Sequence, residues 1–62
     1  MNKSQIKDLI GVKRVLETSK NCLSAIVSVV EDDLSRKKCR RDLEATNHAI
    51  LTINKLLKVI AH

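Results

Sequence analysis

The sequence has no aromatic residue, no proline and only one glycine among its 62 residues. Strand-rich folds need many tight turns, and such turns draw heavily on glycine and proline. Without aromatic rings, any core must be built mainly from the 20 isoleucine, leucine and valine residues. The composition therefore favours an all-α fold with an aliphatic core. A chain this short buries only about 60% of the surface that its unfolded form exposes, so it is marginal on its own.

Covalent and metal supports are also scarce. The two cysteines, Cys22 and Cys39, are too few for a disulfide framework and are not spaced as zinc ligands. Oligomerisation is then the remaining way to stabilise so small a chain. The sequence contains no nucleophile–base pair, paired carboxylate site or glycine-rich phosphate loop. We therefore predict a protein that is not an enzyme and that binds no cofactor, metal or small molecule.

Long apolar runs are missing as well. Charged residues interrupt every apolar stretch, so none approaches the roughly 20 residues of a membrane span. The charged side chains between Lys3 and Arg14 leave no continuous apolar region for a signal peptide. Two isolated cysteines without an export signal fit a reducing cytosol. The sequence thus predicts a cytoplasmic protein that does not enter membranes.

Two long helical patterns are present. In the first, an apolar residue recurs every seven positions, at Leu9, Leu16, Leu23 and Val30. Alternate positions between them hold Val12, Ser19 and Ile26. Neighbouring residues, including Cys22 as a core residue, widen the stripe to an arc of roughly 260°, against about 100° for an ordinary surface helix. One neighbouring helix cannot cover so wide an arc. We predict this helix over about residues 4–31, with Ser4 as its N-cap.

The second helical pattern is narrower and more regular. Its apolar stripe alternates by four and three through Cys39, Leu43, Thr46, Ile50, Ile53, Leu57 and Ile60. The stripe spans about 140°, and we predict the helix over about residues 36–61. The expected core and self-association residues of the two helices together are Leu9, Leu16, Leu23, Val30, Leu43, Ile50, Ile53 and Leu57.

A bend at about residues 32–35 joins the two patterns. On one continuous helix Val30 and Leu43 would lie roughly 140° apart, and a turn removes this mismatch. Asp32, Asp33 or Ser35 could cap the second helix, where acidic residues also favour its positive end. We predict a single domain over residues 1–62. It is a two-helix antiparallel hairpin that dimerises into a four-helix bundle.

One alternative architecture stays open at this point. The first helix has no glycine or proline to end it, and Asp32–Arg36 and Asp33–Lys37 are acid-first pairs four residues apart. Both features would support one continuous helix of about 55 residues that pairs with another copy.

The sharpest local feature is a run of five bases in six residues, Arg36, Lys37, Lys38, Arg40 and Arg41. Clustered cations release counterions from nucleic acid, and bases near a helix N-terminus oppose its macrodipole. Because bases at this place are unfavourable for helix stability, they suggest a role in binding. The net charge of +5 suggests the same. The alternative is a solvated helix end, neutralised by the five acids of residues 31–44. The lack of aromatic residues to stack on bases disfavours single-stranded nucleic acid and RNA.

The layout of the whole chain resembles a group of phage proteins. The features that carry the resemblance are the series Leu9/Leu16/Leu23/Val30, the acidic–basic segment Glu31–Arg41 and the series Leu43/Ile50/Leu57. They resemble the small all-helical accessory proteins encoded in the exo–xis region of lambdoid bacteriophages. That resemblance implies an early lytic-development factor of the host cytoplasm that binds a host or phage protein. The layout is also similar to a plasmid RNA-binding four-helix-bundle dimer, which would imply RNA binding.

We therefore expect a non-enzymatic interaction protein, a dimeric hairpin whose assembled surface binds another protein. The alternative is a nucleic-acid-binding module that uses the basic segment Arg36–Arg41. A membrane-surface helix is less favoured, because the basic and apolar residues do not form one clean interfacial face.

Overall fold

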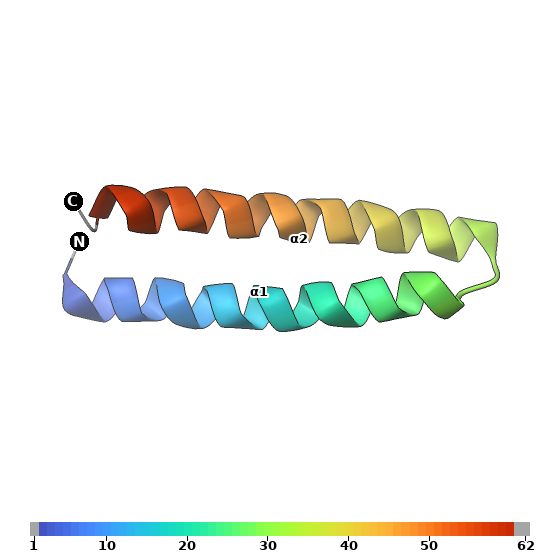
Figure 1. Cartoon of the computed structure of the whole chain (residues 1–62), viewed down its shortest axis with the longest axis horizontal. Helices are drawn as coiled ribbons and strands as arrows, with labels where there is room; N and C mark the ends of the chain where they lie inside the picture. Colours follow the sequence, from blue (N-terminus) through green and yellow to red (C-terminus); the bar gives the residue numbers. More distant parts are fainter. Residues whose placement is uncertain (1, 61–62) are drawn as a thin grey trace.

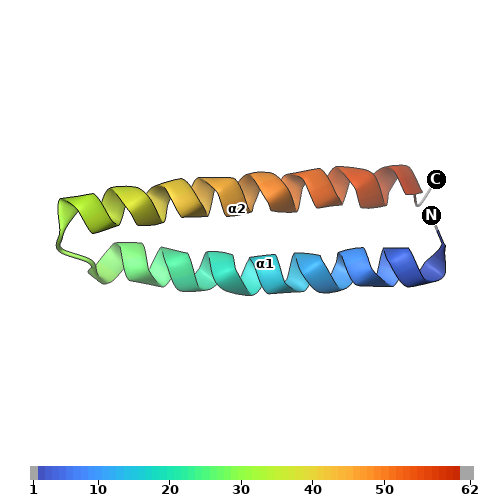
Figure 2. The same ribbon diagram turned by 180° about the vertical axis from the view of Figure 1, so that it is seen from behind.

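The computed structural model describes residues 2–60, which form two long helices joined by a short turn (Figure 1). Helix α1 spans Lys3–Val29 and helix α2 spans Asp33–Ile60. The helices run antiparallel and make a rod of 45 × 15 × 12 Å, with the turn at one end (Figures 1 and 2). The predicted all-α fold with two helices packed against each other is confirmed, and the single long helix is wrong.

The N-terminal cap of α1 differs from the prediction. The side-chain Oδ1 of Asn2 accepts a hydrogen bond from the N–H of Gln5 at 2.8 Å. In return, Oε1 of Gln5 accepts one from the N–H of Asn2 at 3.0 Å. This reciprocal pair is a capping box, and it satisfies two N–H groups that have no partner within the helix. Ser4, the predicted N-cap, lies inside the first turn instead. The Asn-x-x-Gln spacing was the signal that identifies the true cap.

The turn lies two residues earlier than predicted, at residues 30–32. Val30 leaves the helix with an extended backbone (φ −73°, ψ 126°), although its N–H still donates to the carbonyl of Ile26. Asp32 caps the N-terminus of α2, because its carboxylate accepts a hydrogen bond from the N–H of Ser35 at 2.9 Å. Residues 33–35, predicted as part of the bend, are therefore the first turn of α2. Residue 61, the predicted end of the second helix, lies outside the described residues.

The Asp32 carboxylate caps the N-terminus of α2. The Ser35 hydroxyl and then the Ser35 N–H lower the pKa of Asp32 below its ordinary value, because both donate hydrogen bonds to the ionised form. The negative charge also sits at the positive end of the α2 macrodipole. An ionised Asp32 therefore stabilises the start of α2 after a turn that contains neither glycine nor proline.

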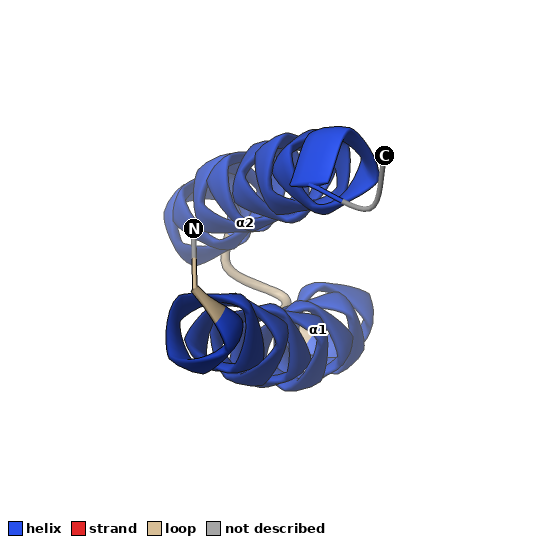
Figure 3. Ribbon diagram, turned by 90° about the vertical axis from the view of Figure 1, so that its left-hand side faces the viewer, coloured by secondary structure: helices blue, strands red, loops and turns tan. Residues whose placement is uncertain are grey.

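The seam between the helices is built from the two heptad series. On α2 every residue of the predicted stripe is buried or half-buried, and Ile50 and Ile53 are the buried residues of the described chain. On α1 the residues Leu9, Leu16, Leu23 and Val30 are half-buried. Each helix has only the other as a neighbour among the described residues, as the end-on view in Figure 3 shows. Two buried side chains make a very small core.

The prediction placed the second row of α1 seam residues on the wrong flank of the leucines. The residues that alternate with the leucines in the seam are Ile6, Lys13 and Val27, which are half-buried. Val12, Ser19 and Ile26, predicted for this place, are exposed. The wide arc of α1 offers a row on each side of the leucines, and a single helix can cover only one. Lys13 is tolerated in the seam because its stem lies along apolar surface while its ammonium reaches Glu17 at 3.8 Å.

Candidate interaction surfaces

The apolar arc of α1 continues past the seam onto a face that no other helix covers. We call this set the outer row, and it consists of Val12, Val15, Ser19, Cys22, Ile26 and Val29. All six are exposed, and the four larger side chains have exposed fractions between 41% and 75%. Cys22, predicted to be a core residue, belongs to this row because α2 packs against the other flank of α1. It is a free thiol.

The outer row has a simple geometric origin. Five of its six residues directly precede a half-buried seam residue, as Val15 precedes Leu16 and Cys22 precedes Leu23. The sixth, Ser19, precedes Lys20, which is exposed at the equivalent position of the series. One residue corresponds to about 100° of rotation, so the row lies about a quarter-turn away from the seam. In an antiparallel pair, the residues that precede the seam on either helix fall on the same side of the hairpin. The outer row therefore shares its face with the equivalent residues of α2.

The α2 half of this face is apolar toward the open end of the hairpin. Leu56 and Val59 directly precede the seam residues Leu57 and Ile60, and both are exposed. Nearer the middle of α2, the same flank carries the small residues Ala45 and Ala49 and the polar Thr52, and toward the turn it carries the charged Asp42 and Lys38. We call the outer row together with this flank of α2 the apolar face.

The opposite side of the hairpin is polar. It consists of the residues that directly follow the seam positions. On α1 these are Lys7, Ile10, Arg14, Glu17, Asn21, Ser24 and Ser28. On α2 they are Lys37, Arg40, Glu44, Asn47, Leu51, Asn54 and Lys58. The hairpin as a whole is therefore amphipathic, although neither of its helices shows this division clearly from its own sequence.

The total surface shows how much remains uncovered. The hairpin has an accessible surface of 5125 Å². A compact monomer of its mass, 7.0 kDa, is expected to expose about 4,000 Å². The excess is about 1,100 Å², and a stable protein–protein interface buries about 800 Å² on each partner. The uncovered surface is thus large enough for one standard interface.

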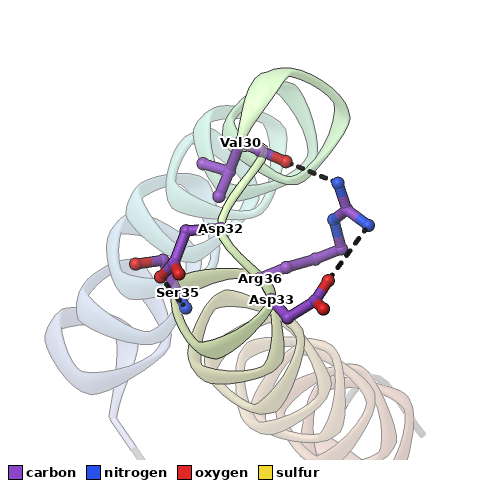
Figure 4. A network of polar contacts seen from close by, with 5 residues as sticks. All are labelled: Val30, Asp32, Asp33, Ser35 and Arg36. Carbon is purple, nitrogen blue, oxygen red and sulfur yellow. Dashed lines mark hydrogen bonds and ion pairs between the residues drawn. The ribbon is translucent and has the colours of Figure 1, made fainter.

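At the turn, Arg36 is held by the backbone and by an acid (Figure 4). Its guanidinium donates to the Val30 carbonyl at 2.7 Å and lies 3.9 Å from the carboxylate of Asp33. The Val30 carbonyl belongs to the C-terminal end of α1, where a cation also complements the macrodipole. Arg36 therefore contacts Asp33 and the Val30 carbonyl, and not Asp32 as the sequence spacing suggested. Arg36, a predicted binding residue, is thus engaged in holding the turn.

The other four bases of the predicted segment point away from the seam. Lys37, Lys38, Arg40 and Arg41 are exposed, and the ion pairs among residues 2–60 involve none of them. At 100° per residue they share an arc of roughly 160° on the outer surface of α2. Lys37, Lys38 and Arg41 also line an open hollow of about 380 Å³ together with Leu34. We call these four residues the basic patch.

Two classes of site are not found in the described part of the chain. No group of three histidine, cysteine or acidic side chains within residues 2–60 is placed to hold a metal ion. Neither α1 nor α2 is apolar enough over a sufficient length to cross a membrane. No protein-family model, curated protein or solved structure matches this chain. The apolar face and the basic patch are therefore the surfaces from which function can be argued.

Proposed function

We propose that this chain is a non-enzymatic interaction protein. Its hairpins dimerise through the apolar face into a four-helix bundle, and the assembled surface binds another protein. The observation that carries the proposal is the uncovered outer row of α1, beside a core of only two buried residues. Soluble monomers rarely leave so large a contiguous apolar surface in water, and such patches mark association sites.

Folding and association are coupled in this proposal. A hairpin that buries two side chains has little apolar burial to offset the conformational entropy lost on folding. Any partner that binds the folded form adds stability, and the gain grows with the logarithm of the ratio of its concentration to the dissociation constant. A second copy of the chain is the partner that is always present. The thermal midpoint should therefore rise with protein concentration.

Sedimentation equilibrium tests the proposal. At micromolar concentration the mass is expected to be at least twice the 7.0 kDa of one chain. Circular-dichroism melts of the same samples over a hundredfold dilution provide the second readout. A well-folded monomer with a melting temperature that does not depend on concentration would contradict the proposed dimer.

The proposed biological role is regulation by binding. The size and layout of the chain, which resemble those of lambdoid phage accessory proteins, support an early phage development factor that acts on a host or phage protein. The net charge of +5 supports an acidic partner surface. In a bundle closed through the apolar faces, the polar sides of both hairpins remain available for that partner.

The basic patch supports a second candidate function, which is binding to nucleic acid. Four exposed cations without acidic partners on one arc of α2 suit contacts to a row of phosphates. Of the acids near the patch, Asp32 caps α2 and Asp33 pairs with Arg36. Asp42 and Glu44 follow the patch directly, but neither forms an ion pair with it among the described residues.

Replacing Lys37 and Lys38 by glutamine is expected to leave stability unchanged or slightly higher. The double substitution removes no ion pair found among the described residues, and both lysines lie beyond the first turn of α2, where the macrodipole effect has largely faded. If the patch binds nucleic acid, affinity falls and its salt dependence becomes shallower by roughly two counterions. The measurements are a low-salt thermal melt and a salt titration of DNA and RNA binding.

The matched control replaces Lys55 and Lys58, two exposed lysines at the far end of α2, by glutamine. This variant has the same net charge as the first. Equal loss of binding in both variants would assign the effect to net charge and not to the basic patch. Clear destabilisation by Lys37→Gln and Lys38→Gln with unchanged binding would assign these lysines to structure.

A further inference from the structure

Along the outer row of α1, the order of large and small side chains is nearly the same in both directions. From Val12 to Val29 it runs valine, valine, serine, cysteine, isoleucine, valine. Its centre falls between Ser19 and Cys22, with two larger side chains on each side. Reversal therefore exchanges Val12 with Val29, Val15 with Ile26 and Ser19 with Cys22. Large residues meet large ones and small residues meet small ones.

We infer that two copies of this chain pack α1 against α1 in antiparallel orientation, about a twofold axis between Ser19 and Cys22. The inference rests on the proposed dimer and specifies its interface. A twofold interface requires that residue i of one copy meets residue j of the other, and that j meets i. The outer row satisfies this condition along its whole length, with Val15 of each copy against Ile26 of the other.

The side chains of the row suit a close antiparallel contact. Ser19 and Cys22 are the smallest members and lie at the axis, so the two helices can approach most closely there, at the short end of the usual 8–10 Å between helix axes. No residue of the row is charged over the 18 residues from Val12 to Val29, or about 26 Å of helix. Ala45 and Ala49 on the same face leave room for the α2 helices to join the contact.

Twofold geometry selects the antiparallel orientation over the parallel one. In a parallel α1 pair the axis runs along the helices and places the two α2 helices on opposite sides of the α1 pair, so that only α1 is covered. In an antiparallel pair the axis runs across the helices, so that α1 lies over α1 and α2 lies over α2, as a closed four-helix bundle requires.

Disulfide trapping with two single-cysteine chains tests the inference. The native thiols are first removed by Cys22→Ser and Cys39→Ala, and one chain then carries Val15→Cys while the other carries Ile26→Cys. Both new thiols replace exposed side chains, so the fold is retained. In the antiparallel pair each position is about 16 Å along the axis from its own copy, too far for a disulfide. Crosslinking is therefore expected only when the two chains are mixed and re-annealed.

The control replaces Ser24, which follows the seam residue Leu23 and lies on the polar side. A Ser24→Cys chain mixed with the Val15→Cys chain is expected to give no crosslink. Crosslinking of the Val15→Cys chain with itself would show a parallel pair and overturn the inference. A dimer by sedimentation without crosslinking in the mixture would also overturn it, while leaving the proposed self-association in place. A monomer by sedimentation would overturn both.

Discussion

Replacing Ile53 by alanine is expected to destabilise the hairpin by about 2–5 kcal/mol, as truncation of buried aliphatic side chains does. Ile53 has an exposed fraction of 8%, and Ile50 is the only other described side chain with comparable burial. Small domains have a total stability of only about 5–15 kcal/mol. The loss of either isoleucine therefore removes a large part of what holds α1 and α2 together. Thermal and urea unfolding, followed by circular dichroism, measure the effect.

Leu51→Ala is the matched control for this truncation. Leu51 lies two residues away on the same helix, but its exposed fraction is 59% and it belongs to the polar side of the hairpin. Its truncation is expected to change stability by no more than about 0.5 kcal/mol, because surface substitutions away from special features have small effects. Equal destabilisation by Leu51→Ala and Ile53→Ala would mean that α2 buries a different face.

Placing lysine at both Val15 and Ile26 is expected to convert the dimer to a monomer of 7.0 kDa. In the inferred interface these two positions of opposing copies face each other, so the variant brings like charges together at two symmetric sites. Like charges in contact at an interface cost several kcal/mol. Since both side chains are exposed in the single hairpin, the substitutions disturb no packing within one chain. Sedimentation measures the mass, and far-UV circular dichroism reports how much helix the monomer retains.

A charge-paired variant separates the effect of charge repulsion between the two copies from the effect of losing apolar side chains. Val15→Glu combined with Ile26→Lys places opposite charges across the antiparallel interface and like charges across a parallel one. This variant is expected to dimerise more tightly than the double-lysine variant. Ile10→Lys, on the polar side of α1, is expected to leave the dimer unchanged. Equal dimerisation by all three variants would contradict an interface on the outer row.

Most of the fold could be predicted because its signals are local. The stripe on α2 is narrow and has only one possible buried face, and the structure buries that face. Asp32 was among the predicted caps of α2, because a short acidic side chain just before a helix can accept a hydrogen bond from a free N–H of the first turn. The bend was predicted too late in the sequence because three candidate caps, Asp32, Asp33 and Ser35, lie close together. Only the backbone geometry of the turn selects among them. The Asn2 cap was not predicted because Ser4, which is also a good capping residue, lies closer to Ile6, the first apolar residue of the pattern.

The candidate surfaces were harder to predict from the pattern alone. The five bases of the basic segment look equivalent in sequence, yet Arg36 reaches back to the Val30 carbonyl while the other four remain exposed. That distinction depends on where the chain turns, because the turn brings the end of α1 within reach of the Arg36 side chain. No periodicity in the sequence reports such a contact.

The sequence by itself determined the all-helical structure, the two apolar patterns with their approximate lengths, and an apolar arc on the first pattern too wide for one neighbour; one continuous helix stayed open until the structure showed the turn. These properties follow from residue periodicity and composition, which act within a few turns of helix. The tertiary structure decided which part of the arc is covered. The turn at residues 30–32 sets α2 against the row of Ile6, Lys13 and Val27, and leaves the outer row facing water. Both rows flank the same leucines at equivalent helical spacing, so only the direction from which the second helix approaches could separate them.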